Sequence, residues 1–586
     1  MDRITENLLG EFSKEHGIDA LADEKRFEHL AAYVTIRRHY SKTFDTGDLV
    51  TSGGDDTGVD AIAMIVNGVL ITDIDIFKEI AEQASHFDVV CVFVQAERSA
   101  AFDGRTIGNF GFGVQDFFSD APTLRRNEEI TKAAEIMSAI LDQSGRFQKN
   151  PVCHLYYVTT GKWNPDDATL EGRRQSEIED LRNTRLFSDV FFVPIDAEQI
   201  HKLYRQSRNA VARQFNFEKK AVIPEIPGVQ ESYLGYLPAN QFLKLITDED
   251  GEMLGGLFYD NVRDWLGLDS VEVNKEIKDC LDSEAQADRF VLMNNGITII
   301  ARSLKVSGDR FSIENYSIVN GCQTSHVLYE SREDLSDSVM VPVRLIGTQD
   351  EDVINDIIHA TNRQTAVKAE QFFALEDFPK GLERYFQTFD DQFKLYYERR
   401  TNQYDQLSIE KTRIITPANM IRAFASMFLN EPHRATRNYA ALRDKVGDTI
   451  FAEGHRMEPY YVAAFTLYKL EYLFRSKQLD PKYKPARFHI LLATRLLAAD
   501  EQVPRSNSHE MERYCKPLMD VLWDYDKAHI LISDAAEIID LVADSNFHRD
   551  NIRTEPFTQK LITEVHKMIA RGAEDEANHP EAFRGI

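Results

Sequence analysis

The sequence predicts an α/β (α+β) protein with a mainly helical C-terminal region. Short apolar runs alternate with amphipathic stretches over residues 55–210, the pattern of strands that alternate with helices. Further apolar strands occur between residues 290 and 347, and beyond residue 410 apolar residues recur at helical spacing. The chain of 586 residues is long enough for about two to four domains.

Composition excludes several classes of protein. No run of about eighteen apolar residues occurs, so we expect no membrane span. The N-terminus has the pattern of a charged amphipathic helix and lacks the apolar core of a signal peptide. The five cysteines are scattered without a CxxC pair, which argues against a disulfide framework and favours a cytoplasmic location. The net charge of −27 argues against a surface that is basic throughout, although a confined basic groove remains compatible with it.

The first 215 residues predict two helices followed by alternating strands and helices. An aspartate, Asp60, opens the apolar strand AIAMIV, and Asn67-Gly68 is a hairpin turn signal. Glycines alternate with aromatic residues over 101–120, and we expect a flexible wall there. The expected helices are 1–17, 20–41, 128–143, 167–183 and 197–209, and the expected strands after the hairpin are 89–94, 153–161 and 190–196.

Three polar side chains gather at the ends of two of these strands. Asp60 precedes the first strand of the hairpin, and the strand VVCVFV ends in Gln95-Ala96-Glu97. Because side chains alternate along a strand, Gln95 and Glu97 point to one face. We therefore expect Asp60, Gln95 and Glu97 to meet at one edge of a small sheet. Clustered oxygen ligands of this kind suit Mg²⁺ or Mn²⁺.

This layout resembles the PD-(D/E)xK nuclease superfamily, which places an Asp on one strand and (E/Q)xK on the next. The resemblance implies a restriction-endonuclease-like mixed sheet and an acid on an upstream helix, for which Glu28 is the candidate and Glu24 lies one turn earlier. It assigns Asp60, Gln95, Glu97 and Glu28 to catalysis, and Asp60, Glu28 and Glu97 to the metal. Glu97 stands where the superfamily has its lysine. A fold that has lost catalysis, or an acidic strand end that faces solvent, remains the alternative.

Domain boundaries follow from composition. Residues 216–231, NFEKKAVIPEIPGVQE, contain charges and turn-forming Pro and Gly residues and predict an inter-domain linker. The predicted domains are therefore 1–215, a nuclease-like domain, 232–410, a central α/β domain, and 411–586, a helical C-terminal region.

Six sequence blocks follow one another in the central domain. They are FYDNVRDWLGLDSVEVNKEI (258–277), FVLMNNGITIIARS (290–303), YSIVNGCQTSHVLYE (316–330), VPVRLIG (341–347), HATNRQTAVKAEQFFAL (359–375) and YYERRTNQY (396–404). In this order and spacing, over about 150 residues, the blocks resemble the AIPR family, the abortive-infection phage-resistance proteins of bacteria. The resemblance implies a role in phage defence. The family commonly has a nuclease-like N-terminal region, so the two resemblances support each other.

Amide side chains and arginines recur in these blocks, and we expect many of them to form one polar cleft. The NNGIT block predicts a tight turn before a strand. The VNGCQTS block predicts a strand, a glycine turn and a helix start, whose free amides can bind anions. It is faintly similar to the turn of ParB-like and DGQHR domains. Amides and arginines suit phosphates and base edges, although such side chains often only connect loops. The candidate ligand-binding residues are Asn294, Asn295, Gly296, Asn320, Gly321, Gln323, Thr324, Asn362, Arg363, Gln364 and Arg399.

These observations predict a metal-dependent nuclease of phage defence whose central domain senses or clamps nucleic acid or a nucleotide. Mg²⁺ or Mn²⁺ is the expected cofactor, nucleic acid is the expected partner, with DNA favoured over RNA, and a homo-oligomer is compatible with the sequence. The alternative is a catalytically degenerate nuclease fold that only binds nucleic acid or regulates. A third reading is a toxin that acts when a partner releases it. The identity of any bound nucleotide is left open.

Overall fold

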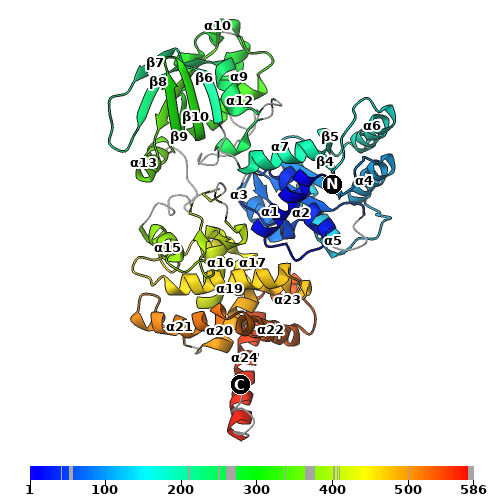
Figure 1. Ribbon diagram of the computed structural model, residues 1–586, viewed down its shortest axis with the longest axis vertical. Coiled ribbons are helices and arrows are strands. Elements are labelled where there is room, and N and C mark those ends of the chain that lie inside the picture. The colour runs from blue at the N-terminus through cyan, green and yellow to red at the C-terminus, as the bar shows by residue number, and fades with distance from the viewer. Residues whose placement is uncertain are drawn as a thin grey trace. The chain divides into compact units, whose positions relative to one another are not determined.

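The computed structural model contains two compact units (Figure 1). The first unit consists of Met1–Gly10 and Asp23–Phe372, and the second of Glu11–Ala22 and Phe373–Ile586. The predicted α/β class with a helical C-terminal region is confirmed. The residues that the structure describes are 1–40, 42–51, 57–208, 212–248, 251, 253–258, 272–336, 338–362, 377–399, 403–404, 407, 409–499 and 502–578.

A five-stranded mixed sheet forms the core of the first domain, with strand order β2-β1-β3-β4-β5. β3, β4 and β5 are parallel, whereas β1 is antiparallel to both of its neighbours. Asn67 and Gly68 both have positive φ in the turn between β1 and β2, which confirms the predicted hairpin. The strands are β1 (Ala61–Val66), β2 (Val69–Leu70), β3 (Val89–Glu97), β4 (Val152–Thr159) and β5 (Asp189–Ile195).

Helices cover both faces of this sheet. Cys91 and Phe93 of β3 pack in one apolar cluster with α4, α5 and α6. Side-chain alternation places Val92 and Val94 on the other face, where α2 packs on β3 and also contacts α7. The helices are α1 (Arg3–Glu15), α2 (Asp23–Ile36), α3 (Ile74–Gln83), α4 (Gly104–Phe117), α5 (Glu128–Leu141), α6 (Ala168–Asn183) and α7 (Ala197–Arg208).

The glycine-rich stretch 101–120, predicted as a flexible wall, instead contains helix α4. Asp103 caps this helix by accepting a 3.0 Å hydrogen bond from the backbone N–H of Thr106. The glycines allow close packing, because a Cβ on Gly111 would lie 2.1 Å from Glu177 of α6 and one on Gly113 would lie 2.0 Å from the carbonyl oxygen of Thr57. The prediction was wrong because these glycines are packing positions on a capped helix.

A six-stranded sheet forms the second domain of this unit, in the order β6-β10-β9-β11-β8-β7. Among the described strand pairs of this second sheet, only β9 and β11 are parallel. One face packs on α8, α9, α11 and α12, and Ile300 and Val319 on the other face pack on α13. The elements are β6 (Ala212–Asn216), β7 (Lys219–Val222), β8 (Glu231–Pro238), α8 (Ala239–Ile246), α9 (Glu272–Asp282), α10 (Glu284–Ala287), α11 (Phe290–Met293), β9 (Ile297–Ser307), β10 (Arg310–Asn320), α12 (Cys322–Glu330), β11 (Met340–Gly347) and α13 (Glu351–Asn362).

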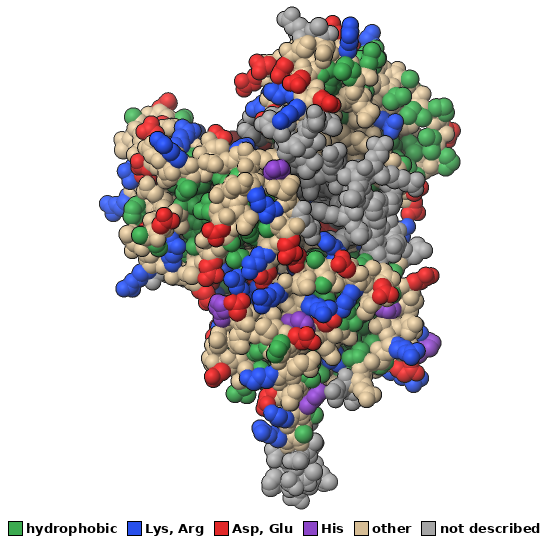
Figure 2. All heavy atoms as spheres, turned by 180° about the vertical axis from the view of Figure 1, so that it is seen from behind, with side chains coloured by type: hydrophobic (Ala, Val, Ile, Leu, Met, Phe, Trp, Pro, Cys, Tyr) green, Lys and Arg blue, Asp and Glu red, His purple; other side chains and the backbone are tan. Residues whose placement is uncertain are grey.

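The stretch 216–231, predicted as a linker, lies within the second sheet. It contains β7, which pairs with β8 in an antiparallel ladder, and it begins and ends in residues of β6 and β8. Its charged and apolar residues form a short edge strand, a position in which lysines and a short length are common. Leu234 and Tyr236 of β8 are exposed on this flank of the sheet. Figure 2 shows hydrophobic side chains among the charged ones on the surface of the protein.

The second unit is mainly helical, as predicted. Its core is an apolar cluster that includes buried residues of α16, α19, α20 and α22. Among the described residues, no helix is both long enough and apolar enough to cross a membrane. The elements are α15 (Asp377–Gln387), β12 (Tyr396–Tyr397), β13 (Ile414–Ile415), α16 (Pro417–Phe428), α17 (Pro432–Arg437), α18 (Tyr439–Arg443), α19 (Glu458–Arg475), α20 (Arg487–Ala498), α21 (His509–Trp523), α22 (Tyr525–Ala543), α23 (Arg549–Ile552) and α24 (Glu555–Asn578).

Candidate active site

The start of β1 and the end of β3 meet at one edge of the first sheet. The backbone N–H of Asp60 donates a 2.8 Å hydrogen bond to the carbonyl oxygen of Val94. The Asp60 carboxylate in turn accepts a 2.7 Å hydrogen bond from the backbone N–H of Ala96. Because Ala96 lies between Gln95 and Glu97, the buried Asp60 carboxylate is held at the strand end that carries both of these side chains.

Gln95 and Glu97 lie on the face of β3 that α4 covers. The side-chain oxygen Oε1 of Gln95 is buried and has no hydrogen-bond partner. Glu97 accepts a 2.7 Å hydrogen bond from the Tyr157 hydroxyl of β4 and a 3.1 Å bond from the Thr106 hydroxyl of α4. Burial and the Glu97 carboxylate raise the pKa of Tyr157 well above its usual range, so Tyr157 remains a proton donor at neutral pH. The Glu97 carboxylate is therefore fixed in orientation.

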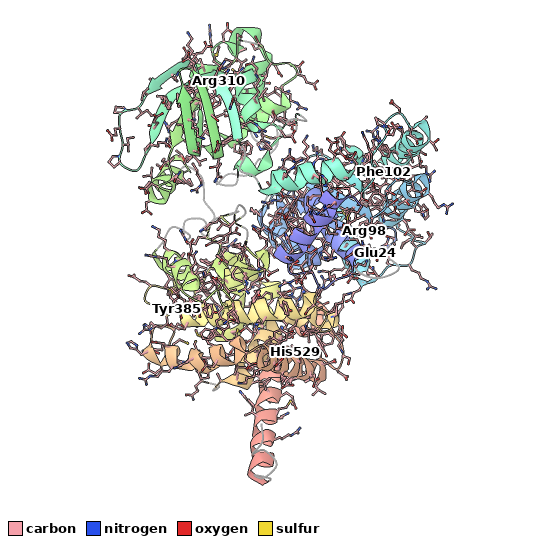
Figure 3. All side chains as sticks on the ribbon, viewed as in Figure 1. Glu24, Arg98, Phe102, Arg310, Tyr385 and His529 are labelled. Atoms are coloured by element: carbon pink, nitrogen blue, oxygen red, sulfur yellow. The ribbon has the colours of Figure 1, made fainter. Side chains whose placement is uncertain are left out.

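Glu28 is not brought to this face. It lies on α2, which packs on the opposite face of the sheet, and both of its oxygens accept hydrogen bonds from Lys25, at 2.9 and 2.8 Å. Arg98, which directly follows Glu97, forms a 3.0 Å ion pair with Asp23, the first residue of α2. Figure 3 labels Arg98 and the next residue of that helix, Glu24. Lys25 and Arg98 thus supply positive charge beside the acids of α2.

The oxygen atoms at this edge fit a hard divalent cation in part. Within the described ranges, no three His, Cys, Asp or Glu side chains form a group that could hold a metal ion. Glu28, Asp60 and Glu97 thus do not make a three-carboxylate cluster. A buried amide oxygen without a partner, as in Gln95, is rare in proteins and is a suitable Mg²⁺ or Mn²⁺ ligand. Asp60, Gln95 and Glu97 are the side chains that would hold such a cation at this edge.

Two polar turns of the second sheet lie against each other, the turn from Asn294 to Gly296 and the turn at Gly321. Asn294 donates a 3.0 Å hydrogen bond to the Thr324 hydroxyl and accepts one of 2.9 Å from the backbone N–H of Gly296. Gly321 has φ +98° and approaches Gly296, because a Cβ on Gly321 would lie 3.2 Å from the Gly296 carbonyl oxygen. The predicted strand, glycine turn and helix are confirmed in β10, Gly321 and α12.

Buried amides extend this cluster. Gln323, in the first turn of α12, accepts a 2.8 Å hydrogen bond from Asn274 of α9. Asn320 donates a 2.8 Å hydrogen bond to the carbonyl oxygen of Thr361, at the C-terminal end of α13. The end of α13 therefore lies beside the turn. Asn295 lies in the same turn as Asn294, between α11 and β9.

The other predicted ligand-binding residues are not all in the described part of the chain. Arg363 and Gln364 lie outside it, and Asn362 is described only by its helical backbone. Arg399 lies in the second unit, where it forms an ion pair with Glu383. The turns that the structure does bring together thus belong to β9, β10, α12 and α13.

Four residues near the first site were not singled out from the sequence. Tyr157 and Thr106 hold Glu97, Arg98 binds Asp23, and Lys25 binds Glu28. Lys25 is detectable in the sequence, because a Lys three residues before a Glu on a helix is a recognised ion-pair spacing. Tyr157 and Thr106 are not, because their contacts with Glu97 depend on how β4 and α4 pack.

The comparisons with known proteins agree with the second of the two resemblances. Neither the comparison with curated proteins nor the comparison with solved structures finds a match to the chain. The family model described as AIPR protein matches residues 258–563. This match extends from the second sheet through most of the helical unit and spans more than half of the chain, and the protein therefore belongs to the AIPR family.

Proposed function

We propose that this AIPR-family protein is a divalent-metal-dependent nuclease that acts in abortive infection, the bacterial defence against phage. Membership of the family suggests the defence role. One observation carries the nuclease assignment: the Asp60 carboxylate is hydrogen-bonded to Ala96, between Gln95 and Glu97, and Gln95 offers a buried oxygen without a partner. The antiparallel direction of β1 supports it, because it brings the start of β1 to the end of β3.

The residues at this edge have distinct roles in the proposed reaction. Asp60 supplies a negative charge whose position is fixed by Ala96, and Gln95 supplies a neutral oxygen. Tyr157 and Thr106 orient the Glu97 carboxylate toward the same edge. A bound Mg²⁺ or Mn²⁺ supplies a water of lowered pKa and neutralises charge on the scissile phosphate. In this proposal Glu97 has taken over a ligand role, since a carboxylate cannot stabilise a phosphate as a lysine does.

The second sheet supports a role in binding nucleotides or nucleic acid. The first turn of α12 follows a glycine that gives it no side-chain cap, and helix N-termini of this kind bind phosphates through backbone N–H groups. Asn294 and Asn320 fix the surrounding turns through hydrogen bonds. We assign sensing or clamping of nucleic acid to this domain.

The alternative is a nuclease fold that has lost catalysis and only binds nucleic acid. The observation that favours it is the engagement of both Glu97 oxygens by hydroxyl groups. Under this alternative, the Glu97 carboxylate serves only the packing of α4 on the sheet. Cleavage by the wild-type protein separates the two functions.

The test is a cleavage assay with plasmid DNA and total RNA in Mg²⁺ or Mn²⁺. We expect cleavage by the wild type and a loss of at least about a hundredfold in Asp60→Asn, because removal of a group that stabilises the transition state by about 3 kcal/mol has this effect. Asparagine retains an acceptor for the Ala96 N–H, so the strand end keeps its hydrogen bond.

The matched control is Asp116→Asn, which removes another buried carboxylate of the same domain. Asp116 accepts hydrogen bonds from Thr123 in the loop after α4, at 2.6 and 2.8 Å, and has no place in the proposed site. Equal cleavage by wild type and Asp60→Asn, or no cleavage under any of these conditions, contradicts the nuclease assignment.

A further inference from the structure

A row of three ring side chains lies on the first sheet away from the candidate active site. The rings of His39 and His154 lie 4.3 Å apart between centroids, with their planes tilted by 42°. His154 then stacks on Phe191, with centroids 4.9 Å apart and planes 13° from parallel. His39 is fixed in turn by a 2.8 Å hydrogen bond between its Nε2 and the Tyr156 hydroxyl. The row runs from the end of α2 across β4 to β5, the edge strand of the sheet.

The strand register explains this stack. His154 and Phe191 are direct neighbours in the parallel pairing of β4 and β5. Neighbouring strands lie about 4.8 Å apart, so two flat side chains at paired positions meet face to face. The flat faces of these rings therefore point across the strands. Since β5 is the last strand, the second face of Phe191 points off the edge of the sheet.

Phe191 is 45% exposed, an unusual state for a phenylalanine in a strand. Among the described residues, no ring other than His154 stacks on it. A single exposed aromatic side chain needs no explanation. Phe191 differs because the rings behind it hold it in place. Its side chain therefore loses little conformational entropy when a flat ligand stacks on it.

The charged groups near the row are Arg38 and Asp189. The exposed Arg38 guanidinium lies 5.8 Å from the Tyr156 ring centroid, and its charge also acts on His39 and His154. Asp189, two residues before Phe191 on the same strand, faces His154 as well. Burial lowers the pKa of His154 to about 4, so its ring is neutral at pH 7. The platform thus has neutral rings, one exposed cation and one carboxylate that can accept N–H groups of a base.

We propose that Phe191 is a stacking platform for an unpaired nucleobase, with His154 and His39 as its support. Base stacking on a ring that a sheet holds is a general way to bind single-stranded nucleic acid. A duplex cannot use the platform, because its bases are already stacked on each other. The chemistry is that of a nucleobase with a nearby phosphate, which a single strand and a free nucleotide share.

The platform is separate from the metal site. His154 pairs with Val92 of β3, and Glu97 lies five positions further along that strand, which corresponds to roughly 16 Å. Binding at Phe191 therefore needs no metal. It is measured in EDTA, which removes divalent cations and leaves the proposed nuclease inactive. Asp60→Asn should bind single strands as the wild type does, so failure of the nuclease assignment and failure of the platform are distinguishable.

The experiment is fluorescence anisotropy of a labelled 12-nucleotide single strand, as DNA and as RNA, with the full-length protein. We expect Phe191→Leu, which keeps apolar bulk but has no ring, to raise Kd about fivefold or more, the loss of one base–aromatic stack. Phe191→Trp should bind at least as well as wild type. Phe112→Leu is the control, since Phe112 is a 48% exposed phenylalanine of the same domain outside the row.

Competition with AMP and the comparison of the two leucine variants decide the proposal. If AMP, at concentrations near its own Kd, displaces the labelled strand from the wild type but not from Phe191→Leu, the platform binds free nucleotides. If AMP does not displace the strand, the platform binds single strands. The proposal is overturned if wild type binds neither, or if Phe191→Leu and Phe112→Leu have the same Kd.

Discussion

Helix α4 closely approaches the segment that leads to Asp60, at Gly113, and Gly113→Ala tests this packing. A Cβ at this position would lie 2.0 Å from the carbonyl oxygen of Thr57, whereas ordinary contact begins near 3.4 Å. The obstacle is backbone, so it cannot rotate away. Either α4 or the segment from Thr57 to Asp60 must move by more than about 1 Å.

The magnitude follows from two opposing effects. Overpacking of this kind destabilises a protein by about 1–3 kcal/mol, and replacement of a helical glycine by alanine stabilises it by about 1 kcal/mol. Gly172→Ala is the matched control, since Gly172 lies in α6 of the same domain and a Cβ there meets nothing within 4 Å. The difference between the two variants isolates the steric effect, which we expect to be about 1–3 kcal/mol.

The assay is native-state hydrogen exchange of α4 and β1 peptides, which reports the stability of this domain alone. We expect faster exchange in Gly113→Ala and unchanged or slower exchange in Gly172→Ala. Because the displaced segment leads to Asp60, Mn²⁺ binding should also weaken in Gly113→Ala alone. Equal protection in the two variants would refute the packing of α4 on Thr57.

Three further outcomes are expected. Glu97→Lys should weaken Mn²⁺ binding in calorimetry about tenfold or more, because it replaces a carboxylate with a cation; cleavage faster than wild type would instead place the protein in the degenerate class. Asn294→Ala should destabilise the turn before β9 by about 1–3 kcal/mol, since the Thr324 hydroxyl and the Gly296 N–H lose their partner, and unchanged hydrogen exchange in α12 would contradict this. Burial holds the pKa of His489 at about 3, below its unfolded value of about 6.5. As the pH decreases from about 6.5 toward 3, the unfolded state binds the proton first, so the stability of the folded state falls. His489→Leu should make the urea-unfolding midpoint less dependent on pH over this range. Identical pH profiles of the wild type and the variant would exclude His489 as the cause of the pH dependence.

Local signals in the sequence predict the first site's strands well. Asn67-Gly68 identifies the turn because both residues adopt positive φ, and the alternation of side chains along a strand places Gln95 and Glu97 on one face. The meeting of Asp60 with Ala96 follows from antiparallel pairing of two adjacent strands, which is the commonest arrangement in a sheet.

Other features depend on tertiary contacts that no local pattern contains. Aromatic and glycine residues in 101–120 give a weak helical signal, and only the packing against Glu177 and Thr57 shows why the glycines are there. The position of Glu28 depends on which face of the sheet α2 covers, a choice that its own sequence leaves open. The stack of His154 on Phe191 requires the β4–β5 register, which links residues far apart in the chain.

The most direct test of the central claim is calorimetric titration of Mn²⁺ into the wild type, Asp60→Asn and Asp116→Asn. The account predicts binding by the wild type and by Asp116→Asn, and loss of at least about tenfold in affinity in Asp60→Asn, since one of two carboxylates at the edge is removed. Identical Mn²⁺ affinity in Asp60→Asn and the wild type would contradict the assignment of Asp60, Gln95 and Glu97 as a metal site.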